Sequence, residues 1–267
     1  MLRTSTELIF LTPEYSLNSP WELLLYTLMG FIAALASVGF SRILYISEDI
    51  WNLIRIPEPT KPILGGVLLG LLGIASYQID GFPRVFGVGY ETIESTLFSQ
   101  LTLQVTLGLL ILKLIATTLT LGSGGSGGIF APSLFMGAML GASFGQIAHT
   151  LFPEIVAPSG AYALVGMAAF FSGAAHAPIT AILILYEMTG DYQIILPLML
   201  ATVLSTIVLY RYSTYSYSIY VPVLEYEYTV YKLYSEYKYC TRTSTTVAIP
   251  VVLVLVVRLP VLRQYKQ

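Results

Sequence analysis

The chain has 267 residues, of which 55% are hydrophobic and only 10% charged, with a mean hydropathy of +0.74 and a net charge of −2. So few polar groups cannot cover a soluble globule, and we therefore predict an integral, multi-pass membrane protein. The low net charge gives no electrostatic basis for nucleic-acid binding. A single cysteine excludes an intrachain disulfide, and two histidines without an HExxH string argue against a metal site.

The first spanning helix is predicted at 23–40, an uncharged and mostly apolar run. Ser19 and Pro20 precede it and suit the cap and first turn of a helix. Residues 1–18 contain Glu7 and Glu14 and lack a long apolar core, so we do not expect a cleavable signal peptide there. Insertion would then use the first mature helix.

A second spanning helix is predicted at 62–79, where four glycines are spaced for close contact with another helix. The loop between the two spans contains Arg42, Arg55 and Lys61. Because positive residues collect in cytoplasmic loops, we place this loop in the cytoplasm.

The segment 90–98 is too short to span, and Glu91 and Glu94 give it a solvated face, so we expect it at the membrane interface. The next span is predicted at 101–121, with Lys113 as its only charge. We interpret Lys113 as a side chain that snorkels, forms a salt bridge or faces protein, ahead of a role as an anion ligand.

The remaining apolar segments are interrupted. They are predicted at 129–148, 161–175, 179–188 and 192–210, and glycines or prolines precede the first three. Irregular backbone at membrane depth is tolerated only where protein or a water-filled cavity covers it. The breaks therefore favour a transporter or channel built from tilted and broken helices.

The string GSGGSGGIFAP at 122–132 places seven small residues before an apolar segment. Pro132 suits the first turn of a helix, so we predict a helix that begins near Ile129. The first amides of a helix have no partner within it and carry partial positive charge, so this position suits an anion without a nearby Lys or Arg. The alternatives are a flexible linker, which an apolar helix would not directly follow, and a phosphate loop, which would need a Lys after the glycines.

Three parts of the chain together resemble the CLC family of chloride channels and chloride/proton antiporters. They are GSGGSGGIFAPSLFMGAMLG at 122–141, YEMTGDYQIILP at 186–197, and the pair SPWELLLY at 19–26 and GVGYE at 87–91. The resemblance covers roughly residues 15–211. It implies an all-α fold that corresponds to the second of two inverted halves of the family's transmembrane unit, and a homodimer with one pore per subunit.

The resemblance also implies a site for chloride as the permeant ion. The backbone amides of Ile129 and Phe130 would donate to the anion, with Gly128 beside them and the glycines of the loop (Gly124, Gly125 and Gly127) keeping side chains out of the way. In the family a tyrosine hydroxyl completes the site, and we place it at Tyr220. Taken alone, Phe130 is more typical of a core residue and Tyr220 of an interfacial one.

Other family elements are absent from the chain. These are the Gly-Ser-Gly-Ile-Pro string, the gating glutamate in its Gly-Lys/Arg-Glu-Gly-Pro string and the proton-transfer glutamate. We therefore divide the chain into an N-terminal segment at 1–18, a partial transmembrane domain at 19–211 and an atypical Tyr/Val-rich tail at 212–267. A truncated or frame-shifted gene model is one hypothesis for this pattern, and a separate N-terminal half is a possible partner.

Three further ionisable residues are candidates with ordinary alternatives. Glu187 lies in a long apolar stretch, but it is close to the segment's end, so helix capping is favoured over transport. His149 and His176 fall at helix ends, which favours cap or interface roles over proton transfer.

From the sequence we predict chloride transport across the plasma membrane, by a channel or a chloride/proton antiporter, with the lipid bilayer and a second copy as partners. The alternative is a transport-inactive fragment that only assembles, through segments such as 182–185 and 198–208. No set of nucleophile, base and orienting group indicates an enzyme, and we expect no cofactor.

Overall fold

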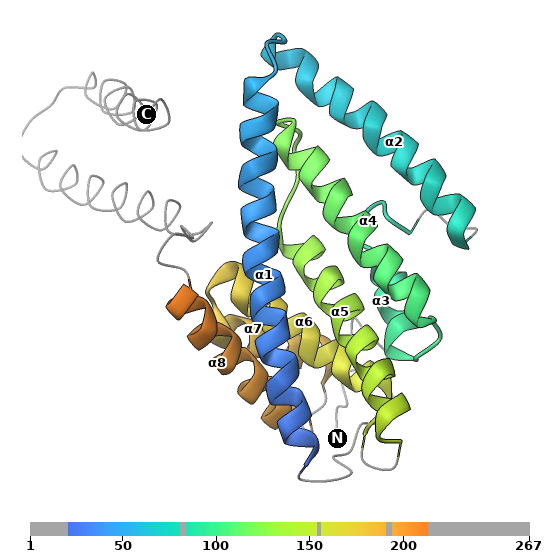
Figure 1. Cartoon of the computed structure of the whole chain (residues 1–267), viewed down its shortest axis with the longest axis vertical. Coiled ribbons are helices and arrows are strands. Elements are labelled where there is room, and N and C mark those ends of the chain that lie inside the picture. The colour runs from blue at the N-terminus through green and yellow to red at the C-terminus, as the bar shows by residue number, and fades with distance from the viewer. Residues whose placement is uncertain (1–20, 81–83, 154–155, 191–193, 213–267) are drawn as a thin grey trace, which may run out of the picture. The chain divides into compact units, whose positions relative to one another are not determined.

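The computed structural model describes residues 21–80, 84–153, 156–190 and 194–212 (Figure 1). These residues form only helices, which confirms the predicted all-α class. In chain order the elements are α1 (Glu22–Leu53), the short 3₁₀ helix η1 (Glu58–Thr60), α2 (Lys61–Asp80), α3 (Tyr90–Leu97), α4 (Leu103–Gly122), α5 (Phe130–Leu151), α6 (Ser159–Ala175), α7 (Pro178–Thr189) and α8 (Ile195–Tyr212).

The predicted end of the first helix at residue 40 is wrong, because α1 continues to Leu53 and has 32 residues. The uncharged run stops at Phe40, but the charged residues beyond it lie on an exposed face, while Leu44 and Trp51 stay buried. An amphipathic continuation of this kind carries no breaking residue, so the helix persists. The other predicted segments agree with the observed helices to within a few residues.

Helix α6 lies at the centre of the packing. Every residue from Ser159 to Ala175 is buried. The helices α1, α5, α7 and α8 and the short α3 all pack against it, as the ribbon shows (Figure 1). A helix that is apolar all round needs such a fully enclosed position.

The crossing of α5 and α6 depends on glycines. Gly137, Gly141 and Gly145 of α5 face α6 at a spacing of four residues, so they lie on one side of the helix. A Cβ added at Gly137 would be 2.6 Å from the carbonyl oxygen of Gly166, and one at Gly141 would be 2.9 Å from the Cα of Ala163 and in contact with the backbone of Tyr162. The two backbones therefore approach as only small residues allow.

Small polar side chains join α6 to α8. The hydroxyl groups of Ser172 and Thr206 lie 2.8 Å apart, and Ser205 donates to the carbonyl oxygen of Ala169 at 2.8 Å. These contacts satisfy the fully buried hydroxyl groups of Ser172 and Ser205, as an apolar environment requires.

The chain between α6 and α7 is broken. His176 ends α6 in a left-handed conformation, with φ of 57°, and Pro178 starts α7. With 12 residues, α7 is about 18 Å long, which is well short of a hydrocarbon core of about 30 Å. This confirms the prediction of broken helices, while α1, α4 and α5 are each long and apolar enough to cross a membrane.

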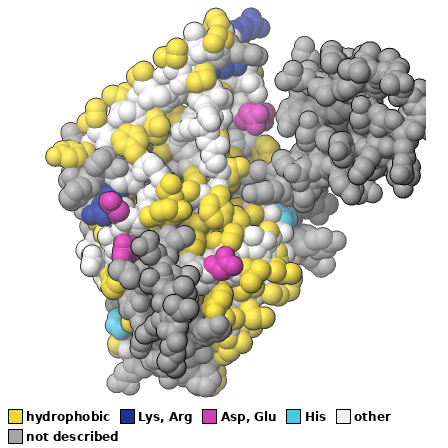
Figure 2. All heavy atoms as spheres, turned by 180° about the vertical axis from the view of Figure 1, so that it is seen from behind, with side chains coloured by type: hydrophobic (Ala, Val, Ile, Leu, Met, Phe, Trp, Pro, Cys, Tyr) yellow, Lys and Arg dark blue, Asp and Glu magenta, His cyan; other side chains and the backbone are white. Residues whose placement is uncertain are grey.

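Large hydrophobic side chains spread over the described surface, with few charges among them (Figure 2). The segments suggested above for assembly need correction in part, because Leu185 and Leu198 are buried within the chain. Within these segments Leu183, Met199, Val203 and Ile207 do face outward, as does Ile179 at the start of α7.

We predict that Gly141→Ala destabilises the protein by about 1 to 3 kcal/mol, because its methyl group would overlap the backbone of α6. The matched control is Gly108→Ala in α4, where an added Cβ meets no atom within 4 Å and the change is expected to be neutral or stabilising by up to about 1 kcal/mol. The free energy of unfolding in detergent micelles measures both. Equal effects of the two substitutions would contradict the close crossing.

Candidate functional site

The glycine loop, residues 122–128, joins the end of α4 to the start of α5. Its first part folds back on α4: the amide of Gly124 donates to the carbonyl oxygen of Leu121 at 3.0 Å, and the amide of Gly125 donates to that of Thr120 at 2.9 Å. With Gly124 at φ of 81°, this is a Schellman motif. The motif satisfies the last carbonyl groups of α4 before the chain turns.

The predicted site glycines therefore have different roles. Gly124 supplies the left-handed turn, and a Cβ at Gly125 would be 2.7 Å from the carbonyl oxygen of Thr120, so both glycines serve the end of α4. A Cβ at Gly127 would be 3.2 Å from the Leu121 side chain. Among these site glycines, Gly128 alone has neither a positive φ nor a close neighbour that would demand glycine, because an added Cβ there meets no described atom within 4 Å.

Helix α5 begins at Phe130, with Ile129 as its N-cap residue, which confirms the predicted start. No side chain caps this end, and the first amide that bonds within the turn is that of Ser133, which donates to the carbonyl oxygen of Ile129 at 3.0 Å. Pro132 has no N–H. The amides of Ile129, Phe130 and Ala131 thus make no hydrogen bond to another described residue.

These amides lie in a half-buried position at the positive end of the helix dipole. The ring of Phe130 packs edge-on against Phe171 of α6, with centroids 5.1 Å apart and planes at 83°. This contact fixes the side chain to the protein, and the start of α5 keeps its amides available for a ligand. The core role that the sequence suggested for the Phe130 side chain is thus observed, while anion binding by its amide stays a prediction.

The structure brings Ile129, Phe130 and Gly128 together with the loop glycines. Tyr220, the predicted hydroxyl donor, lies outside the described residues, as do the segment 1–18 and residues 213–267 of the tail. The described residues therefore include the backbone amides predicted as donors, and the prediction for Tyr220 falls outside them.

Lys113 has partners that the sequence did not predict. Its side chain is 3% exposed, and its ammonium group donates to the carbonyl oxygens of Val85 at 2.9 Å and Gly87 at 2.7 Å. The same group lies 4.9 Å from the ring centroid of Phe135 in α5, as in a cation–π contact. Lys113 thus faces protein, one of the predicted alternatives, and joins α4 both to the loop at 84–89 and to α5.

Glu22, which belongs to the SPWELLLY string at 19–26, is fully buried. Its Oε1 accepts from the amide of Ala157 at 2.8 Å and from the hydroxyl groups of Tyr26 at 3.1 Å and Tyr162 at 3.3 Å. The two tyrosine rings stack with centroids 4.5 Å apart. This network holds the start of α1 to the chain that enters α6, and only the unusual placement of a carboxylate before an apolar run signals it in the sequence.

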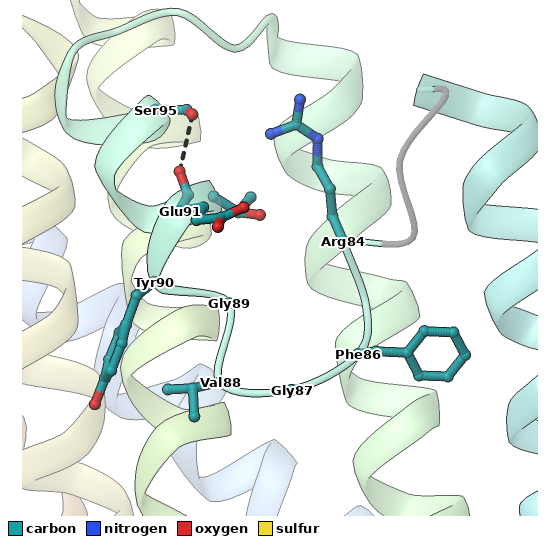
Figure 3. Close-up of a pocket in the computed structure, with 9 residues that line it drawn as sticks. Arg84, Phe86, Gly87, Val88, Gly89, Tyr90, Glu91 and Ser95 are labelled. Carbon is teal, nitrogen blue, oxygen red and sulfur yellow. Dashed lines mark hydrogen bonds between the residues drawn. The ribbon is translucent and has the colours of Figure 1, made fainter.

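A pocket lies between the loop at 84–89 and α3 (Figure 3). Arg84, Glu91 and Ser95 line it, and Ser95 donates to the carbonyl oxygen of Glu91 at 2.8 Å. The ring of Phe86 points away from it toward α2. None of the lining residues belongs to the glycine loop or to the first turn of α5, so this pocket is separate from the uncapped amides.

The remaining candidates lie near helix ends, as predicted. Glu187 is exposed close to the end of α7, and His149 is in the last turn of α5. Glu91 is exposed in α3, whose opposite face is buried against α5 and α6.

The chain matches the family model described as "Voltage gated chloride channel" over residues 2–210. It is 34% identical over 195 residues to a putative chloride channel protein, ClcB-like, of Ralstonia nicotianae and 31% identical over 202 residues to the H⁺/Cl⁻ exchange transporter ClcA of Vibrio campbellii. These alignments cover 73% and 76% of this chain but 44% and 43% of the relatives. The chain thus spans less than half the length of either relative.

Among solved structures, a slow cyanobacterial Cl⁻/H⁺ antiporter is similar, with a TM-score of 0.70 and 26% sequence identity. The match covers 82% of this chain and 50% of that one.

We predict that Lys113→Met accelerates hydrogen exchange at the amides of the 84–89 loop by about tenfold or more, because two charge-assisted hydrogen bonds that hold this loop are lost. The control is Arg55→Met, an exposed cation remote in sequence, which should leave the loop unchanged. Exchange measured by mass spectrometry on the detergent-solubilised protein checks both. Unchanged exchange in Lys113→Met would show that the loop is held by other contacts.

Proposed function

The chain belongs to the voltage-gated chloride channel family, and from this we propose that it forms the C-terminal half of a pore that carries chloride across the membrane. The observation that carries the proposal is the uncapped start of α5, where the amides of Ile129 and Phe130 make no bond to a described residue. The similarity to a chloride channel protein, ClcB-like, and to an H⁺/Cl⁻ exchange transporter supports chloride as the ion.

Uncharged donors suit a permeant ion. A lysine in direct contact would hold the anion strongly, whereas conduction needs binding that is favourable but weak enough to allow release. Amides at a helix start provide partial positive charge and directed N–H groups in a low-dielectric environment. Gly128 supports this assignment, because the fold gives no packing reason for a residue without a side chain at that position.

The proposal also covers the membrane, a second copy of the chain and the other half of the pore. We place the protein in the plasma membrane as a homodimer, with the exposed apolar residues of α7 and α8 as the surface for the second copy. Because the chain spans less than half of its relatives, the other half of the pore would come from a separate polypeptide or from sequence outside this chain. The proposed activity involves no covalent chemistry and no cofactor.

Chloride efflux from liposomes separates this proposal from a transport-inactive fragment. The chain is reconstituted alone and together with the N-terminal half of a relative such as the Vibrio campbellii transporter. Flux above that of empty vesicles in either preparation supports transport. Absence of flux in both, with folded protein present in the membrane, favours the inactive fragment.

We predict that replacing the amide of Phe130 by an ester, which removes this N–H and leaves the side chain unchanged, weakens chloride binding by about tenfold or more, since a hydrogen bond to a charged group is lost. The matched control is the same phenylalanine-derived ester at Phe144 in the interior of α5, which removes an intrahelical bond instead. Titration calorimetry with chloride, on the pore assembled with the complementary half, measures both. Equal affinity for the two esters would contradict anion binding at this amide.

A further inference from the structure

Two helices outside the α5–α6 pair reach the start of the glycine loop. In α2, Gly65 is buried, and a Cβ added there would be 2.6 Å from the Cβ of Ser123 and 3.2 Å from the carbonyl oxygen of Leu119. In α1, Trp51 and Ser47 adjoin Gly122, where an added Cβ would be 2.9 Å from Trp51 Cδ1. The loop start is therefore in close contact with α2 on one side and α1 on the other.

Hydrogen bonds fix this corner. Ser47 Oγ donates to the carbonyl oxygen of Thr118 in α4 at 2.9 Å, and Ser123 Oγ donates to that of Thr120 at 3.1 Å. Ser123 is 3% exposed and Trp51 is 6% exposed. Since protein interiors are close-packed, a displacement of one of these residues is passed to its neighbours.

The contact is the part of the packing of α2 on α4 that reaches the loop start, while side chains such as Ile63, Val67 and Leu71 of α2 are exposed. The next residue, Gly66, is exposed, and a Cβ added there meets no atom within 4 Å. The close approach is thus specific to Gly65 and not a general property of this turn of α2.

The loop start is linked through the glycine loop to the amides of Ile129 and Phe130, which follow the loop. The Schellman motif ties Ser123, Gly124 and Gly125 to α4, while Gly127 and Gly128 are exposed and make no hydrogen bond to another described residue. Only residues 126–128 separate this motif from Ile129, the N-cap residue of α5, so the short stretch of backbone is the route by which a shift at Ser123 would reach the first turn of α5. Hydrogen-bond strength depends steeply on distance and angle, so small shifts alter an anion site more than they alter folding.

We infer that Gly65 of α2, with Ser47 and Trp51 of α1, is a positioning site for the glycine loop and thereby sets the affinity of the amides at Ile129 and Phe130 for the permeant anion. This inference rests on the proposed function. The residues act through the loop and do not touch the anion.

The test is Gly65→Ala against Gly66→Ala, with the chloride concentration for half-maximal flux measured per folded protein in liposomes that contain the assembled pore. Gly65→Ala should shift this concentration by about threefold or more, and Gly66→Ala should leave it unchanged. Ser123→Gly, which removes the side chain that the new methyl group would meet, should restore the value in the Gly65→Ala background.

Each result has a separate meaning. If Gly65→Ala lowers the yield of folded protein but leaves the half-maximal concentration unchanged, the contact is only structural and the inference fails. Failure of Ser123→Gly to restore the value would also overturn it. If Gly65→Ala does not fold, Ser47→Ala, which deletes only the bond to Thr118, must produce the shift instead. A wild-type pore without saturable chloride flux would remove the proposed function itself.

Discussion

The backbone amides at the start of α5 create the constraint on which this account depends. In an apolar environment an N–H group without a partner costs free energy, so helix ends at membrane depth need a cap, a neighbouring group or a ligand. The first turn of α5 has no side-chain cap and contains Pro132, and its first three amides bond to no described residue. An anion at this point would satisfy several donors at once and add a favourable interaction with the helix dipole.

The rest of the fold holds this helix end in place. The glycines of α5 let it cross α6 at close range, and the ring contact between Phe130 and Phe171 fixes the first turn. The loop before it is closed onto α4 by a Schellman motif and is contacted by α1 and α2. Lys113 bonds to carbonyl groups of the 84–89 loop, and Glu22 accepts from the amide of Ala157 before α6, so both buried charges among the described residues help to hold loops in place.

Features of the fold that depend on residues close together in the chain could be predicted from the sequence. The glycine run and Pro132 are local signals, and they indicated the observed start of α5. The sequence did not predict the carbonyl partners of Lys113, the tyrosines around Glu22 or the contact of Gly65 with Ser123. These pairs lie far apart in the chain and meet only through tertiary packing, which residue patterns do not encode. The end of α1 was missed for a related reason, since its charged residues have an exposed face that only the packed structure defines.

The central claim is tested most directly by bromide in crystals of this chain assembled with the complementary half of the pore. The account predicts an anomalous peak within hydrogen-bonding distance of the amide nitrogens of Ile129 and Phe130. Bromide bound instead at the Lys113 ammonium group or in the pocket at Arg84, with none at the start of α5, would contradict the account.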